Sequence, residues 1–346
     1  MAADELISPL QSFEGRLLFA VPKKGRLLQA SLNLLEGADI QFKRENRLDI
    51  ALVKNLPIAL VFLPAADIPT FVGEGRVDLG ITGYDQVQEH DAGVRALKRA
   101  RRMSGEWISP EDAARDPHGC ETVLDLGFGA CKLQVQVPAK GEYSDGRDLI
   151  GKNIGTSFVN LAQEYFTRLE MEQEQGASTN GDVNAKPIVS GRKLRTNIMH
   201  LSGSVEAACA LGVADGIVDL VESGETMKAA GLKPIDTVVE SSAILIKSKQ
   251  PSNPAMVDLI AARIGGVITA QKYVLCQYNI PKKSLHDATK ITPGKRAPTV
   301  TQLEEEGWVA ISAMVERKGI APVMDELVKV GATDILVLEI RNTRGI

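Results

Sequence analysis

Short apolar runs alternate with helical patterns through the first part of the chain. Residues 17–21 (LLFAV) form an apolar run that ends at Pro22, and leucines with the spacing of one helix face follow at residues 27–35. A second apolar run covers residues 58–63, and residues 77–83 (VDLGITG) predict a strand that enters a glycine turn. This alternation predicts parallel strands covered by helices on both faces of a sheet.

The middle of the chain predicts a second set of strands and helices. An irregular, highly charged stretch at residues 98–119 interrupts the first rhythm. Apolar runs at residues 133–137 and 154–157 then predict strands, and residues 161–169 carry a helical pattern. Residues 170–182 (EMEQEQGASTNGD) are polar and lack periodicity, so they predict a flexible surface loop.

The pattern changes again after the sequence PSNP at residues 251–254. A helical stripe at residues 256–267 precedes strands and helices in the order β-α-β-β-α-β, over residues 273–340. This order predicts the ferredoxin-like split arrangement, an α+β fold. Fold alone assigns no function to such a unit.

Composition excludes several classes of protein. The 346 residues are enough for two or three domains, and the net charge of −4 argues against a nucleic-acid partner. Four cysteines and four histidines are scattered without the spacing of a zinc site. Residues 1–14 lack the apolar core of a secretory signal, and no later apolar run has the length of a membrane span. We therefore expect a cytoplasmic protein with reduced thiols and no membrane partner.

The strongest candidate site lies at residues 214–226, where an apolar strand enters the sequence ESGET. A Ser-Gly turn at the start of a helix offers backbone N–H groups and the positive end of the helix dipole, which together bind phosphate. The hydroxyls of Ser223 and Thr226 add two donors. Asp215 and Asp219 are four apart on the strand and are expected on one face, where carboxylates suit ribose hydroxyls or Mg²⁺.

The same residues also fit an ordinary strand–turn–helix corner. Short glycine motifs occur often without a ligand, and serine and glutamate are common at helix starts. The side chains of Glu222 and Glu225 would repel an anion unless they point to solvent, to a metal ion or to the helix start. The turn alone leaves both interpretations open.

Several motifs in one order resemble the ATP phosphoribosyltransferase family. The segment DLVESGET at residues 219–226 resembles the family's loop for phosphoribosyl pyrophosphate (PRPP), and residues 203–220 resemble the run into it. The resemblance spans residues 16–344 apart from two atypical insertions. Its other motifs are PKKGRL, VDLGITG, LGFGACKLQVQVP, GKNIGTSF, GWVAIS and GATDILVLEI.

The resemblance implies an α/β fold with two lobes of the periplasmic-binding-protein type (type II) around a cleft. The second lobe is inserted in the first, and a ferredoxin-like regulatory domain follows. The expected boundaries are 1–119 and 201–250 for catalytic lobe I, 120–200 for lobe II, and 251–346 for the regulatory domain. The resemblance also implies inhibition by histidine and a homo-oligomer, either a dimer or a hexamer built from dimers.

The implied reaction is Mg²⁺-dependent transfer of phosphoribosyl from PRPP to N1 of the adenine of ATP, with release of pyrophosphate. This is the first step of histidine biosynthesis. Asp215 and Asp219 would hold the ribose, with Asp219 as the candidate protein ligand of a Mg²⁺ ion otherwise held through phosphates. The turn Glu222, Ser223, Gly224, Glu225 and Thr226 would bind PRPP phosphate. Residues implied for ATP or pyrophosphate are Lys24, Gly25, Arg26, Asp78, Gly83, Lys132, Thr156 and Ser157.

Two other classes compete with the enzyme. A catalytically silent regulatory or small-molecule-binding relative would share the two-lobed fold, but we expect it to lose the phosphate turn or its basic partners. Both features are present in this chain. A nucleic-acid-binding protein is the third class, and the acidic net charge disfavours it.

Overall fold

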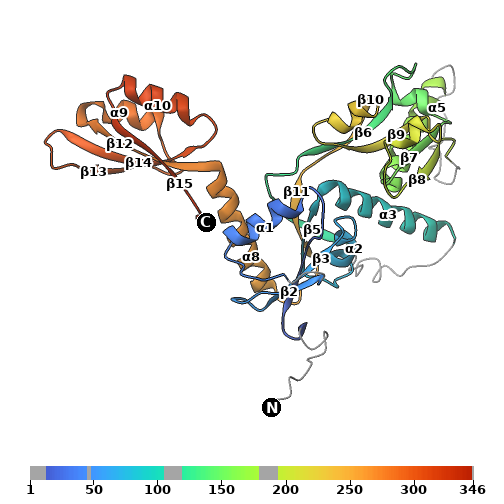
Figure 1. Cartoon of the computed structure of the whole chain (residues 1–346), viewed down its shortest axis with the longest axis horizontal. Helices are drawn as coiled ribbons and strands as arrows, with labels where there is room; N and C mark the ends of the chain where they lie inside the picture. Colours follow the sequence, from blue (N-terminus) through green and yellow to red (C-terminus); the bar gives the residue numbers. More distant parts are fainter. Residues whose placement is uncertain (1–12, 45–47, 105–118, 179–193, 345–346) are drawn as a thin grey trace, which may run out of the picture. The chain divides into compact units, whose positions relative to one another are not determined.

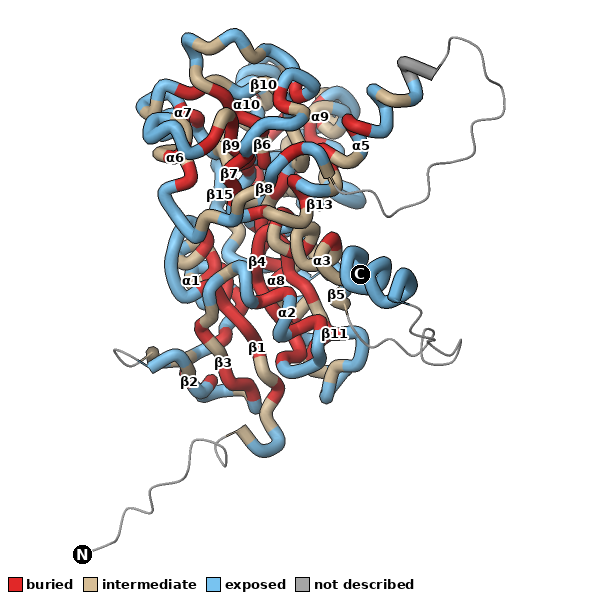
Figure 2. The backbone as a smooth tube through the Cα atoms, turned by 90° about the vertical axis from the view of Figure 1, so that its right-hand side faces the viewer, coloured by how far each residue is buried: buried red, intermediate tan, exposed pale blue. Residues whose placement is uncertain are grey.

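Strand β1 lies in the interior of the first sheet, of which Figure 1 labels β2, β3, β5 and β11. The computed structural model describes residues 13–44, 48–104, 119–178 and 194–344. Residues Leu17–Pro22 of β1 pair in parallel with β3 (Ile58–Leu63) and with β4 (Leu79–Gly83). The three strands are almost wholly buried, as Figure 2 shows in red, because helices cover a parallel core and its strands need apolar side chains on both faces. The predicted parallel core is confirmed.

The outer strands of this sheet run antiparallel to their neighbours. Strand β2 (Ile50–Leu52) pairs antiparallel with β3, while β11 (Ala243–Ser248) pairs antiparallel with both β4 and β5 (Cys120–Asp125). The strand order is β2-β3-β1-β4-β11-β5. The predicted parallel direction therefore holds for β1, β3 and β4 but does not extend to β2 and β11, because strand direction depends on the path of the connections, which an apolar pattern does not encode. The helices of this part are α1 (Leu28–Gly37), α2 (Ile68–Gly73) and α3 (Tyr84–Met103).

A second sheet of mixed direction forms the other lobe of the first unit. Its order is β10-β6-β9-β7-β8, with β9 (Gly216–Val221) between β6 (Cys131–Pro138) and β7 (Asn153–Thr156). Strand β9 runs parallel to β7 and antiparallel to β6. The remaining elements are β8 (Asn197–His200), β10 (Leu232–Ser241), η2 (Gly146–Leu149), α5 (Val159–Ser178), α6 (Ala207–Ala210) and α7 (Glu225–Ala229).

Sheet pairing shifts the boundaries expected for the inserted lobe. Strand β5 belongs to the first sheet, although residues 120–200 are expected in lobe II. Strands β9 and β10 belong to the second sheet, although residues 201–250 are expected in lobe I. The chain passes between the sheets after Asp125 and again after Ser241. The expected lobe assignment of the turn at residues 222–226 is therefore wrong, since a buried apolar run does not reveal which sheet it joins.

The C-terminal segment forms a four-stranded sheet with the predicted ferredoxin-like topology. The strand order is β13-β14-β12-β15, and β12 (Tyr273–Pro281) pairs antiparallel with β14 (Trp308–Glu316) and β15 (Thr333–Glu339). Alternate residues of β12, among them Tyr278, are buried against its helices. The remaining elements are α8 (Pro254–Lys272), η3 (Lys282–Ser284), α9 (Leu285–Ile291), β13 (Thr299–Gln302) and α10 (Ile320–Lys329).

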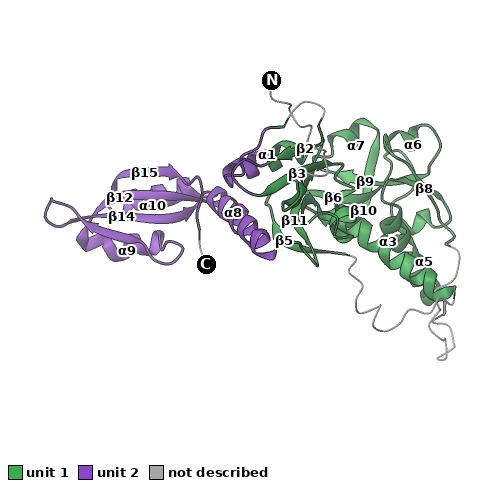
Figure 3. Ribbon diagram, turned by 90° about the horizontal axis from the view of Figure 1, so that it is seen from below, with its two compact units in different colours: residues 1–31, 44–52, 57–253 green, residues 32–43, 53–56, 254–346 purple. Residues whose placement is uncertain are grey.

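The C-terminal unit also includes part of the N-terminal chain (Figure 3). Residues 32–43 and 53–56 group with residues 254–346, and all other residues form the first unit. Asn342 donates a hydrogen bond of 2.9 Å to the carbonyl of Gly37, where the absence of a side chain lets Val267 approach. The second unit is therefore larger than the expected segment 251–346. The end of α1 belongs to this unit and packs against α8 at Val267.

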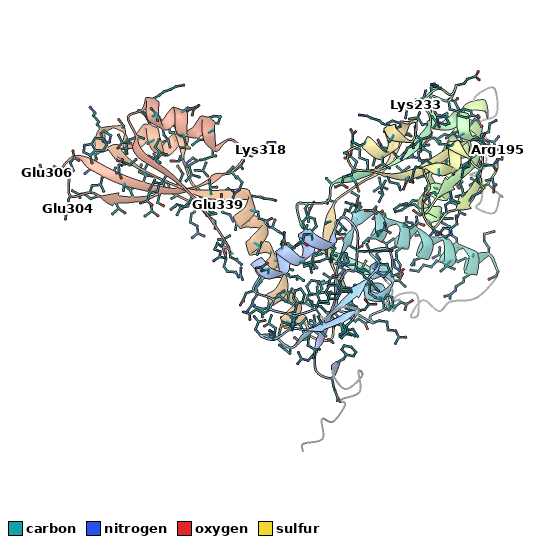
Figure 4. The ribbon with its side chains drawn as sticks, in the orientation of Figure 1. Arg195, Lys233, Glu304, Glu306, Lys318 and Glu339 are labelled. Carbon is teal, nitrogen blue, oxygen red and sulfur yellow. The ribbon has the colours of Figure 1, made fainter. Side chains whose placement is uncertain are left out.

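Helix α5 continues through residues 170–178, which is most of the segment expected to be a loop. It extends to Ser178, and residues 179–182 lie outside the described part of the chain. Glu170 explains the error, because it is polar in sequence yet only 9% exposed. Its carboxylate accepts hydrogen bonds from the N–H groups of Arg195 and Thr196, at 3.0–3.1 Å, and from the hydroxyl of Thr196 at 2.9 Å. Figure 4 labels Arg195 just before β8. An apparently polar segment thus fastens α5 to the strand that follows.

The charged stretch at residues 98–119 begins as regular helix. Helix α3 extends to Met103, and residues 105–118 lie outside the described residues. Within the described residues, no helix has the length and apolar character needed to cross a membrane.

We expect Glu170→Gln to lower the urea midpoint of the second lobe at neutral pH. Burial alone would raise the pKa of Glu170, but hydrogen bonds from the N–H groups of Arg195 and Thr196 outweigh it and lower the pKa. The stabilising effect of the carboxylate is therefore present above its unfolded pKa of about 4.3 and disappears as pH falls through the lower folded pKa. The cost is about 1–3 kcal/mol at pH 7, and it shrinks below about pH 4.

Glu172→Gln is the matched control on the same helix, because Glu172 is exposed and pairs with Arg147 at 3.1 Å. This surface pair is worth about 0–1 kcal/mol. Equal midpoints for the Glu170 variant and the original protein at pH 7 would contradict the anchoring role.

Candidate functional site

The turn after β9 has the backbone geometry expected of a phosphate-binding loop. Gly224 has φ of 80°, a left-handed conformation that favours glycine, and α7 begins at Glu225. The first N–H groups of a helix have no partner within it, so they remain available to a ligand. Met227 is buried in a cluster with Ile217 and Leu232, which fixes α7 against the sheet. The predicted strand–turn–helix is confirmed, and the turn is rigidly attached.

The two glutamates of the turn do not occupy the site of an anion. The side chains of Glu222 and Glu225 are exposed. The carboxylate of Glu225 lies 3.9 Å from the amino group of Lys228, and the two side chains are 80% and 70% exposed. Their negative charges therefore lie in high-dielectric surroundings, where repulsion of a bound phosphate is weak.

Asp219 lies near the turn, whereas Asp215 lies at the far end of the strand. Burial raises the pKa of Asp219; the hydrogen bond from the N–H of Leu220 lowers it, and the charge of Glu206 raises it further. Asp215 precedes β9, and its carboxylate accepts a 2.9 Å hydrogen bond from the N–H of Asn153. Four strand residues span about 13 Å, so Asp215 does not share the surroundings of Asp219. The expectation that both carboxylates hold one ribose is wrong for Asp215, which anchors β7.

In the basic turn after β1, Lys24 points to solvent, whereas Lys23 and Arg26 bind other parts of the protein. Gly25 has φ of 84° and forms the bend, and Lys24 is exposed at its tip. Lys23 binds Asp49 at 2.7 Å. Arg26 instead folds back: its guanidinium donates hydrogen bonds to the carbonyl oxygen of Gly129 and, at 3.1 Å, to the sulfur of Cys131.

A buried carboxylate that sequence reasoning missed lies beside Arg26. Asp85 in the first turn of α3 is fully buried, and its Oδ1 lies 3.6 Å from the guanidinium of Arg26. Gly83 was expected to contact ligand, but its lack of a side chain makes room for Asp85: a Cβ would lie 2.2 Å from Oδ1. In the sequence, the signal for this residue is an acidic side chain two positions after Gly83, the last glycine of VDLGITG.

Two other predicted site residues serve the fold. Asp78 precedes β4, at the end opposite Gly83, and its carboxylate accepts hydrogen bonds from the N–H groups of Leu18 (2.9 Å) and Ser252 (2.5 Å). Thr156 is fully buried, donates to the carbonyl of Val218 at 2.7 Å and accepts from the N–H of Phe158 at 2.9 Å. The expectation of ligand contacts for Asp78 and Thr156 is therefore wrong, because backbone groups already use their oxygens.

Lys132 and Ser157 remain exposed in the second lobe. Lys132 binds Glu240 at 2.7 Å across β6 and β10, and this hydrogen bond lowers the pKa of Glu240. Because water screens such an exposed pair, it is weak, and Lys132 can exchange Glu240 for another anion. Ser157 is exposed between β7 and α5.

A glutamate of the first lobe caps the helix that follows Ser157. The carboxylate of Glu89 on α3 accepts hydrogen bonds from the N–H groups of Asn160 (2.8 Å) and Leu161 (2.9 Å) at the start of α5. Further along the same two helices, the guanidinium of Arg95 on α3 donates two hydrogen bonds, of 3.0 and 2.8 Å, to the carboxylate of Glu164 on α5. Phe158 at the start of α5 has no polar side chain with which to cap the helix, so the two lobes share a hydrogen-bonded helix pair.

The described part of the chain holds no preformed metal site. Among residues 13–44, 48–104, 119–178 and 194–344, no three histidine, cysteine, aspartate or glutamate side chains gather as metal ligands. Outside the turn itself, which contains Glu222 and Glu225, Asp219 is the nearest carboxylate in the sequence.

The fold is that of a two-lobed α/β protein with a C-terminal ferredoxin-like unit. The family model described as ATP phosphoribosyltransferase matches residues 64–266, and the one described as HisG, C-terminal domain, matches residues 270–342. The chain therefore belongs to the ATP phosphoribosyltransferase family.

Similar proteins extend over almost the whole chain. It is 56% identical to the ATP phosphoribosyltransferase of Yarrowia lipolytica over 97% of this chain and 99% of that protein. It is 55% identical to the enzyme of that name from Candida albicans, over 95% and 97%, and 52% identical to that from Saccharomyces cerevisiae over the same shares.

We expect Glu89→Gln to loosen the start of α5, because the amide replaces one acceptor oxygen and leaves an N–H unsatisfied. The cost is about 1–2 kcal/mol. Hydrogen exchange at Asn160 and Leu161 should accelerate accordingly. Glu164→Gln is the control: it breaks the pair with Arg95 but leaves both N–H bonds, so exchange at these two amides should change little. Equal acceleration in both variants would show that Glu89 does not act as the cap.

Proposed function

We propose that this protein transfers the phosphoribosyl group of PRPP to N1 of the adenine of ATP and releases pyrophosphate. The observation that carries the proposal is the left-handed Gly224 turn that follows Asp219, in a chain of the ATP phosphoribosyltransferase family. The reaction begins histidine biosynthesis. We propose that the protein acts in the cytoplasm, as the sequence predicts.

The turn is proposed to bind the 5-phosphate of PRPP. Backbone N–H groups at the start of α7 and the hydroxyls of Ser223 and Thr226 supply the donors. The exposed carboxylates of Glu222 and Glu225 stay in solvent. Asp219 is proposed to accept hydrogen bonds from the ribose hydroxyls, which would also favour its ionised form.

The cations near the site are proposed to neutralise the pyrophosphate and triphosphate groups. Lys24 and Arg26 follow the carboxyl end of β1, the edge at which α/β sheets bind ligands. Lys132 and Ser157 supply donors from the second lobe. Arg26 offers a planar guanidinium that matches phosphate oxygens, and Lys24 adds a mobile point charge.

The chemistry requires charge stabilisation more than proton transfer. Loss of pyrophosphate gives the ribose oxocarbenium character at C1, as in other glycosyl transfers. The carboxylate of Asp219 lies on the strand that leads into the turn and can oppose that positive charge. Adenine N1 attacks with its own lone pair, so no side chain has to act as a general base. When bound, Mg²⁺ supplies charge to the departing pyrophosphate.

The silent relative is disfavoured by the same residues. A catalytically inactive protein has no need to keep a left-handed glycine, a partly buried carboxylate on the strand before it and two basic positions. In this chain Gly224, Asp219, Lys24 and Arg26 are all present.

We expect purified protein with ATP, PRPP and Mg²⁺ to form phosphoribosyl-ATP, measured as a rise in near-ultraviolet absorbance. Gly224→Ala should raise the KM for PRPP by about tenfold or more, because a left-handed alanine costs about 1–2 kcal/mol and displaces the N–H groups. Gly231→Ala is the matched control, since Gly231 has φ of 70° beyond the other end of α7. An unchanged KM in the Gly224 variant would remove the turn from the site.

We also expect L-histidine to inhibit the enzyme by binding the ferredoxin-like unit, and we propose that the protein is a homo-oligomer, a dimer or a hexamer. Histidine should lower the rate and slow hydrogen exchange within residues 273–339. Deletion of the unit is a poor test, because it would uncover Gly37 and the end of α1. D-Histidine is the control. Protection confined to residues 216–229 would instead indicate competition at the active site.

A further inference from the structure

Asp85 is a buried carboxylate with a complete set of partners. Its oxygens accept hydrogen bonds from the hydroxyl of Ser241 (2.5 Å) and the amide of Gln86 (2.6 Å), and Arg26 lies 3.6 Å away. A carboxylate that is fully removed from water is costly unless cations and donors compensate it. The fold thus keeps a negative charge in its interior directly beside an arginine that faces the proposed site.

The surrounding backbone is shaped around this carboxylate. Gly83 leaves the space that Oδ1 occupies, as its Cβ distance of 2.2 Å shows. The Ser241 hydroxyl accepts from the N–H of Asp85 at 2.9 Å while donating to its Oδ1, so two bonds set the carboxylate's orientation. A side chain held in this way has few alternative rotamers.

Arg26 connects this carboxylate to both passages between the sheets. Its guanidinium binds Gly129, which lies in the passage from β5 to β6, and Cys131, which is the first residue of β6. Ser241, which binds Asp85, ends β10 before the chain returns to β11. The guanidinium therefore lies at the carboxyl ends of β1 and β4, which are neighbours in the first sheet. Its five N–H donors exceed these three partners, so donors remain for a ligand.

We propose that Asp85 is a positioning residue, which with Ser241 holds the guanidinium of Arg26 in the orientation that binds the pyrophosphate or triphosphate of the substrates. This inference rests on the proposed function, in which Arg26 binds those phosphates. Asp85 touches no substrate itself; it sets the direction of Arg26 and offsets its charge before substrate arrives. Misplacing such a group by about 1 Å costs about a hundredfold in rate.

The test is a double-mutant cycle on the full chain, with kcat and KM for ATP and PRPP measured separately. Asp85→Asn keeps the shape and the bond from Ser241 but removes the charge that orients Arg26. We expect kcat/KM to fall about tenfold to a hundredfold in Asp85→Asn and further in Arg26→Met. The double variant should be no worse than Arg26→Met, because Asp85 acts only through Arg26.

Asp78→Asn is the matched control, a buried aspartate at the opposite end of β4 whose partners are backbone N–H groups. Any fold-loss of kcat/KM that Asp78→Asn causes should multiply with the fold-loss of Arg26→Met in the double variant, because the two residues act independently. Ser241→Ala supplies a second cycle should Asp85→Asn fold poorly, with the same expected result. Multiplying losses for Asp85 or Ser241 would overturn the positioning role while leaving the proposed function intact. A native protein that forms no phosphoribosyl-ATP would overturn both.

Discussion

The buried contact between Arg26 and Asp85 is the interaction on which the geometry of the first unit depends. It joins the end of β1, the start of α3 and both passages between the sheets through single side chains. Charge in a protein interior is stable only when it is paired and hydrogen-bonded, so each of these segments must stay in place. The lobes are thereby connected at the same residues that meet the substrate phosphates in the proposed reaction.

The second lobe solves the opposite problem, since it must present backbone donors without burying charge. Apolar contacts of Met227 with Ile217 and Leu232 hold α7, and the left-handed Gly224 turns its N–H groups outward. The glutamates of the turn remain in water. A rigid apolar base under a polar turn is a low-entropy way to bind phosphate, because little has to be ordered when the ligand arrives.

Polar side chains in this protein often replace the local capping of secondary structure. Glu89 caps α5 from another helix, Glu170 fastens α5 to the segment before β8, and Asp78 holds the start of β1. In the ferredoxin-like unit, Arg317 binds Glu339, which Figure 4 labels at the end of β15. Each carboxylate supplies hydrogen-bond acceptors where the local sequence has none. In a chain with few aromatic residues, these polar contacts help to specify one fold.

Pattern in the sequence determined most element types, the ferredoxin-like order and the turn at Gly224, because apolar periodicity and glycine chemistry act over short distances. It did not predict that α5 continues to Ser178. The ordered motifs also identified the family, and with it the turn and Arg26 as site candidates. Only the tertiary structure decided that β9 and β10 join the second sheet. Strand pairing depends on residues far apart in the chain, and a buried apolar run does not show which strands it will pair with. The same holds for Asp78, Thr156 and Asp215, whose oxygens are used by backbone groups distant in sequence. The position of Asp85 after Gly83 is visible in the sequence, but only folding brings it to Arg26, 59 positions away in the chain.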